Sequence, residues 1–233
     1  MTQTTTIRNF PEHRYKLGKM EKGIGLSDFT TILNMIDVLN QQENHYVRKY
    51  GADKIKSALA CFYWSGFRKT EVLGGHAKRY LLPPCKRHLQ TIERKSDAVP
   101  GIMKEDIEIK GEWIFITAEP RKKGSRDAPI ELPLVFPYVN LIVEQWDKTT
   151  EGQKVWNITE WDMWHLMKLV DPRQYVHFFR FNRITELCCN PEISLGEICS
   201  WTGLTPLTIN AYLERSGRLI HSAAIKMKRQ YVR

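Results

Sequence analysis

The sequence lacks the features that would indicate a membrane span, a secretory signal or a disulfide framework. No stretch approaches the roughly 18 apolar residues of a transmembrane helix, and residues 1–16 contain no apolar signal-peptide core. The five cysteines form no C-x-x-C pair, which argues against a four-ligand zinc site. Cys85 and His88 have a ligand-like spacing, but no second pair accompanies them. We therefore expect reduced thiols in a cytoplasmic protein.

Positive charge is in excess. Lys and Arg number 35 against 26 Asp and Glu, which gives a formal net charge of +9. With 42% hydrophobic and 26% charged residues, the chain has the composition of a globular protein with a core. The surplus points to a polyanionic partner, and it favours nucleic acid over a membrane surface.

Apolar periodicity predicts a mainly α fold with a small antiparallel β-sheet (α+β). A first helix runs from Phe29 to Leu39 behind a cap at Ser27 and Asp28, and a second helix ends near Ser65-Gly66. Strands are expected at 107–109, 113–116 and 129–132, with a turn at Lys110-Gly111. Further helices are expected at about 138–147, 158–170, 179–189, 194–201, 205–214 and 219–230.

Two segments stand apart from this pattern. Residues 1–26 are Thr-rich and then basic, with no sustained period, so we expect a flexible or loosely attached arm. Residues 75–100 are basic around Pro83-Pro84 and indicate an inserted loop or hairpin. The remainder, residues 27–233, is expected to form one domain that contains this insertion.

Two basic features could bind an anion. Arg68 follows the second helix and precedes Glu71 by one helical turn, so it is either an oriented anion-binding fork or a surface arginine paired with that carboxylate. The turn at 121–126 could project Lys122 or Lys123 into a groove to contact a phosphate or protonate a leaving oxygen. The alternative is a solvated hairpin turn.

A third feature combines His177, Arg180 and Tyr212. His177 and Arg180 are three residues apart at the start of a helix, so they share a face and could hold a phosphodiester together. Tyr212 follows Arg180 after 32 residues, as 212 − 180 = 32. An H-x-x-R pair by itself is weak evidence.

Together, these features resemble the catalytic domain of the tyrosine recombinases, the phage-integrase family. Residues 58–71 are similar to the family's first arginine box, residues 121–133 to its lysine-bearing hairpin, and residues 177–180 to its second box. Tyr212 has the expected distance and order. The resemblance covers roughly residues 30–230 and implies a site-specific DNA recombinase or integrase.

The resemblance also implies a role for each residue. Tyr212 would attack the scissile phosphodiester and form a 3′-phosphotyrosyl link, while Arg68 and Arg180 would clamp the non-bridging oxygens. Lys123, or alternatively Lys122, would protonate the 5′ leaving oxygen, and His177 would assist. No metal or nucleotide cofactor is required, because the covalent link conserves the bond energy.

The sequence departs from the family pattern at two places. Gly203 stands where the family usually has His or Trp; Trp201, two residues earlier, is either a substitute or a core tryptophan. Too few residues precede the Arg68 helix for the usual N-terminal DNA-binding domain. We expect either a minimal member or the catalytic portion of a longer protein, with weak and salt-sensitive DNA affinity.

The expected partner is double-stranded DNA with a specific attachment or core site, and no membrane. Residues 213–233 carry an amphipathic pattern, so they either dock onto a neighbouring protomer or pack on their own domain. By analogy, the first option implies a homodimer or tetramer assembled on DNA. A mobile element of a virus or plasmid is the expected context, in the host cytoplasm or at the nucleoid.

Other functions remain open. Residues 194–214 also have the marks of a helix-turn-helix, namely Cys199, Gly203 and Ile209 at the usual spacing. On that interpretation the protein is a non-catalytic DNA-binding regulator. A recombinase that binds DNA without cutting it and a type IB topoisomerase are further alternatives.

Overall fold

The computed structural model describes residues 25–81, 90–118, 129–171, 176–190 and 192–215, with only the backbone course described for 76–81, 90–98, 211 and 213–215. Its helices are α2 (Leu26–Gln41), α3 (His45–Tyr50), α4 (Ala52–Ser65), α5 (Lys69–Leu73), the short 3₁₀ helix η1 (Lys104–Asp106), α6 (Val139–Asp147), α7 (Glu160–Val170), α8 (Val176–Cys189), α9 (Leu195–Thr202) and α10 (Pro206–Arg215). Its strands are β1 (Gly75–Leu81), β2 (Gln90–Val99), β3 (Ile107–Lys110), β4 (Trp113–Ile116) and β5 (Ile130–Pro133).

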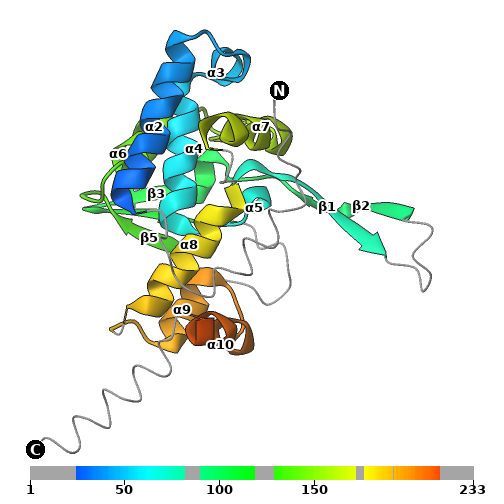
Figure 1. Cartoon of the computed structure of the whole chain (residues 1–233), viewed down its shortest axis with the longest axis vertical. Helices are drawn as coiled ribbons and strands as arrows, with labels where there is room; N and C mark the ends of the chain where they lie inside the picture. Colours follow the sequence, from blue (N-terminus) through cyan, green and yellow to red (C-terminus); the bar gives the residue numbers. More distant parts are fainter. Residues whose placement is uncertain (1–24, 82–89, 119–128, 172–175, 191, 216–233) are drawn as a thin grey trace, which may run out of the picture.

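Helix α4 is the centre of the fold. It packs against α2, α3, α6 and α8, and Figure 1 shows it upright beside α2, with α8 below. From Ser57 to Tyr63 every residue is buried, including the small residues Ala58 and Ala60, which let neighbouring helices approach. A helix buried on all sides is typical of the middle of a core rather than of a surface.

Within the described residues, the strands form two antiparallel sheets. Strands β3, β4 and β5 form a three-stranded sheet in that order, and Lys110 pairs with Trp113 across a turn at Gly111, as the sequence predicts. Ile114 and Ile116 of β4 face the core, in the alternation of a half-buried sheet. Strands β1 and β2 pair antiparallel and extend from the body, so the described part of residues 75–100 follows the hairpin alternative.

Several helix boundaries differ from the sequence prediction. Helix α2 begins at Leu26, and the cap predicted at Ser27 is wrong: Gly25 is the N-cap residue, and its N–H donates to Asp28 Oδ2 over 3.3 Å. Helix α8 begins at Val176, three residues early. Residues 1–24 of the predicted arm and the predicted helix at 219–230 lie outside the described residues.

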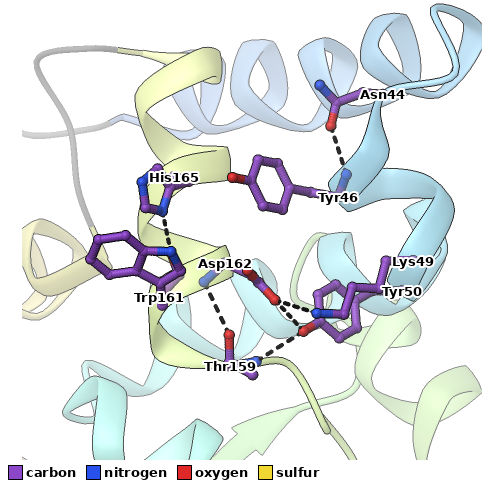
Figure 2. A network of polar contacts seen from close by, with 8 residues as sticks. All are labelled: Asn44, Tyr46, Lys49, Tyr50, Thr159, Trp161, Asp162 and His165. Carbon is purple, nitrogen blue, oxygen red and sulfur yellow. Dashed lines mark hydrogen bonds and ion pairs between the residues drawn. The ribbon is translucent and has the colours of Figure 1, made fainter.

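The sequence analysis missed α3, which a polar network attaches to α7 (Figure 2). Asp162 Oδ2 of α7 accepts from Lys49 Nζ at 2.8 Å and from Tyr50 Oη at 2.5 Å. These two donors, Lys49 first, hold the pKa of Asp162 at about 2. Thr159 caps α7 by accepting from the Asp162 N–H at 3.1 Å. The short helix is therefore stabilised by contacts remote in sequence rather than by its own periodicity.

A second, smaller core lies at the C-terminal end of the described chain. Helices α8, α9 and α10 enclose a cluster of buried side chains: Ile184, Leu187, Cys188, Ile198 and Ile209. Trp201 of α9 contacts both this cluster and the main core, so it bridges the two. Figure 1 shows α9 and α10 beneath the main body, connected to it through α8.

Candidate functional site

The candidate site is built around the C-terminal end of α4. Gly66 ends this helix in the left-handed conformation, with a φ of 62°. The last carbonyl groups of a helix have no partner within it and carry partial negative charge. Here three consecutive carbonyls accept from side chains of α8 and α9: Trp64 O from Arg183 Nε at 2.9 Å, Ser65 O from Trp201 Nε1 at 3.2 Å and Gly66 O from Arg180 Nη1 at 2.7 Å.

Arg180 connects three elements at this point. Its side chain comes from α8, Nη1 donates to Gly66 O, and Nη2 donates to Thr202 O of α9 at 2.8 Å. The residue is 3% exposed. Burial lowers the pKa of Arg180 to about 10, and the nearby Arg68 cation acts in the same direction. The guanidinium therefore stays charged at neutral pH, and its two backbone contacts use only part of its five N–H groups.

Arg68 is the N-cap residue of α5 and lies two residues after Gly66, the C-cap of α4. Its backbone N–H donates to Glu71 Oε2 at 2.7 Å, and its Nη1 donates to Glu71 Oε1 at 2.5 Å. The Arg68 side chain is 18% exposed and that of Glu71 only 4%, so the predicted pair exists but is not a surface pair. A carboxylate that fixes both the backbone and the guanidinium of one arginine gives that cation a defined direction.

Tyr212 approaches this group from α10. It is partly buried, it packs against the smaller core, and its ring centroid lies 5.6 Å from that of Phe181. Glu71 and Tyr212 both raise the pKa of Arg180, against the effects of burial and of Arg68. Arg68, Glu71 and Tyr212 therefore lie near enough to Arg180 to shift its pKa.

The remaining predicted site residues are distributed differently. His177 lies in the first turn of α8 and is exposed, whereas Arg180, one turn later, is buried. Trp201 is partly buried, and its indole N–H donates to Ser65 O, so it forms part of the joint between α9 and α4. Lys122 and Lys123 lie outside the described residues, although the strands that flank them, β4 and β5, pair as predicted.

Helices α9 and α10 have the local order of a helix-turn-helix. Ser194 and Glu197 form a reciprocal capping box at the start of α9, with N–H to oxygen distances of 3.2 and 2.7 Å. Gly203 ends α9 with a φ of 62°, and α10 starts at Pro206. Ile209 is fully buried, and Cys199 is partly buried against the same cluster. The spacing of these residues is therefore explained by packing.

The sequence analysis missed Arg183, which is 7% exposed on α8. An arginine one turn after another arginine, within a helix rich in apolar residues, was the available signal. Its Nε donates to the backbone carbonyl of Trp64, and no pattern of side chains in the sequence identifies such an acceptor.

Within the described ranges, no group of three or more His, Cys, Asp or Glu side chains is placed to hold a metal ion. Cys85 and His88 fall outside the described residues. None of the described helices is long and apolar enough to cross a bilayer.

Comparison with known proteins gives a structural relationship. No protein-family model matches the chain, and no curated protein matches it in sequence. Among solved structures, it is similar to the XerH site-specific recombinase bound to its difH substrate in a pre-cleavage complex, with a TM-score of 0.53 and 12% identity. The match covers 86% of this chain and 52% of the other, so the chain spans about half the length of that recombinase. At this identity the likeness concerns the fold: a mostly helical protein with a small three-stranded antiparallel sheet, similar to a tyrosine recombinase fold.

Proposed function

We propose that this chain is a site-specific DNA recombinase that cuts and rejoins strands through a 3′-phosphotyrosyl intermediate on Tyr212. One observation carries the proposal. Arg180 donates to Gly66 O, two residues before Arg68 in the chain, and its pKa, which burial lowers, responds to both Arg68 and Tyr212. The similarity of the fold to that of a recombinase supports the same chemistry.

The proposed roles follow from the charge that the reaction develops. The Tyr212 phenol gives its proton to water or to His177, its oxygen bonds to phosphorus as the bond to the 5′ oxygen breaks, and negative charge builds up on the non-bridging oxygens. Arg68 and Arg180 stabilise that charge from positions fixed by Glu71 and by backbone carbonyls. A phenol, with an ordinary pKa of about 10, becomes a better nucleophile beside two cations.

Three further residues would complete the reaction. Lys123, with Lys122 as the alternative, would give a proton to the departing 5′ oxygen. His177 would assist as a hydrogen-bond donor or as an acid–base group. For Trp201, a hydrogen bond to Ser65 O favours support of α9 over direct contact with the phosphate.

The proposed partner is double-stranded DNA with a specific core site, bound by a dimer or tetramer that assembles on it. The net charge of +9 supports a polyanionic partner. The structural neighbour, by its description, is bound to its DNA substrate. A mobile element of a virus or plasmid, acting in the cytoplasm or at the nucleoid, is the proposed context.

A suicide substrate tests the proposal. Half-site DNA, from the flanks of the encoding element or from a random-sequence pool, is incubated with the protein and run on a denaturing gel. We expect a covalent protein–DNA band that Tyr212→Phe abolishes and that the matched control Tyr46→Phe, on α3, retains. Lys122→Ala and Lys123→Ala are compared in the same assay, and the variant that loses the band identifies the proton donor. A band that survives Tyr212→Phe contradicts the proposal.

The second candidate is a DNA-binding regulator that uses the α9–α10 helix-turn-helix. The capping box and the left-handed Gly203 between these helices favour it. In the same assay, a regulator shifts DNA on a native gel both as wild type and as Tyr212→Phe, and neither protein forms the covalent band. That result would favour the regulator, or a recombinase that has lost cleavage, over an active recombinase.

A further inference from the structure

Arg183 is a buried cation to which the proposed reaction assigns no role. It lies on α8 one turn after Arg180 and is 7% exposed. Burial lowers the pKa of Arg183, and an unpaired buried charge is costly. A guanidinium is retained in such a place only where its N–H groups and its flat faces find partners, so the contacts of Arg183 indicate what it does.

These contacts join α8 to the end of α4. Nε donates to Trp64 O at 2.9 Å, and Nη1 donates to Glu186 Oε2 at 2.9 Å. The guanidinium carbon lies 4.8 Å from the centroid of the Trp64 ring and 5.9 Å from that of Tyr63. The Glu186 side chain is 55% exposed, so this ion pair is partly screened by solvent. The carbonyl contact and the aromatic contacts therefore carry most of the attachment.

The stem of Arg183 adds a steric contact at the same joint. Its Cγ and Cβ lie 3.0 and 3.1 Å from the point where a side chain on Gly66 would place its first carbon. The backbone of α4 therefore approaches α8 as closely as a glycine allows. Arg183 contacts the end of α4 through its stem, its guanidinium face and its Nε, which donates to Trp64 O. Arg180 donates to Gly66 O, two residues further along.

The joint sets the relation between the two candidate phosphate-binding arginines. Arg180 extends from α8, whereas Arg68 follows Gly66 by two residues. Any movement of α8 along or away from the end of α4 changes the separation of the two guanidinium groups. Catalytic groups must be held to within about 0.5 Å, and a displacement of about 1 Å costs about 100-fold in rate.

We propose that Arg183 is a positioning residue: by attaching α8 to the Trp64 carbonyl and stacking on the Trp64 ring, it fixes the spacing between Arg68 and Arg180. The inference rests on the proposed function for its effect on rate. Its structural part, the attachment of α8 to α4, stands independently. In this role Arg183 acts through the joint between α8 and α4: its Nε donates to Trp64 O, and its guanidinium lies over the Trp64 ring.

The test compares Arg183→Met with Arg48→Met in the full chain. Arg48 is a matched control, because its side chain is 70% exposed and its Glu43 partner lies 3.8 Å away. Three quantities are measured well below the unfolding midpoint: the dissociation constant for half-site DNA, the single-turnover rate of covalent complex formation at saturating DNA, and amide hydrogen exchange over residues 62–74. Arg183→Lys is the second variant; it keeps the charge but loses the planar fork.

For Arg183→Met we expect a rate about 30- to 100-fold lower, a dissociation constant within about threefold of wild type, and exchange at residues 66–68 about tenfold faster. For Arg183→Lys we expect a rate and an exchange between those of wild type and of Arg183→Met. This variant keeps the test valid if Arg183→Met does not fold. A residue needed only for stability would affect binding and rate together, and cooling would restore both. Unchanged exchange, or a rate within twofold of wild type, overturns the inference. If wild type forms no covalent complex, the proposed function fails, and exchange alone decides whether Arg183 fixes the joint.

Discussion

Replacing Gly66 with alanine tests how tightly α4 and α8 approach each other. Gly66 has a φ of 62°, where an alanine costs about 1 kcal/mol. The new methyl carbon would also lie 3.0 Å from Arg183 Cγ. Because Arg183 is fixed by Trp64 O and by the Trp64 ring, it cannot retreat without losing contacts. Overpacking of this kind costs about 1–3 kcal/mol, so we expect a total loss of about 2–4 kcal/mol.

Gly111 offers a matched control. Its φ of 57° is almost the same, and nothing lies within 4 Å of the position that a methyl carbon would occupy. Gly111→Ala therefore carries the same backbone cost without the steric contact, and we expect it to lower stability by only about 1 kcal/mol. The difference between the two variants, about 1–3 kcal/mol, isolates the packing of Arg183 against α4.

Urea denaturation followed by circular dichroism at pH 7 measures both variants, with the comparison made at equal m-values. Both variants exchange glycine for alanine, so effects on the unfolded chain largely cancel. Losses that agree within about 0.5 kcal/mol would refute the reasoning, because the Arg183 stem would then yield without cost.

Two other substitutions address carboxylates that accept hydrogen bonds from a cation, Asp162 from Lys49 and Glu71 from Arg68. Asp162→Asn should lower the free energy of unfolding by about 1–2 kcal/mol at pH 7. Lys49 depresses the pKa of Asp162 to about 2, so this contribution is complete above the ordinary carboxyl pKa and is lost as the pH falls through 2. Roughly half of the stabilisation from Asp162 should remain at pH 3. An equal loss for Asp162→Asn at pH 7 and at pH 3 would contradict this reasoning. The control Asp53→Asn, whose exposed pair with Lys148 spans 4.0 Å, should change the free energy of unfolding little. Glu71→Gln should cost about 1–3 kcal/mol in the same urea titration, because its carboxylate accepts two hydrogen bonds from Arg68; no change would show that the buried charge is dispensable.

Features encoded by a few adjacent residues were predictable. The end of α4 at Ser65 and Gly66 and the turn at Gly111 depend on glycine in the left-handed region, which is a local property. The three-stranded sheet follows from alternation within four-residue strands. Arg68, Arg180 and Tyr212 could be grouped because their motifs and order resemble those of a known family. Their catalytic roles, together with those of Lys123, His177 and Trp201, stay predictions.

The two short helices α3 and α5 were not predictable from the sequence, because they are too short to show a helical period. Helices α3 and α5 have six and five residues, too few to show a 3.6-residue period. Each is stabilised by a carboxylate: Asp162 binds Lys49 and Tyr50 from another element, and Glu71 binds the backbone and side chain of Arg68. Propensity contributes little to helices of this length, and side-chain contacts determine them.

The sequence by itself determined the helical class, the small sheet and the excess of positive charge, because these depend on composition and on short-range periodicity, whereas it left residues 75–100 open as a loop or a hairpin. Only the tertiary structure decided which donors reach the end of α4. Arg180, Arg183 and Trp201 are more than 100 residues away from the carbonyls that they bind at the end of α4. Every residue carries a backbone carbonyl, so no side-chain pattern marks the acceptors. Their selection follows from the packing of α8 and α9 against α4, which the chain settles only when the core forms.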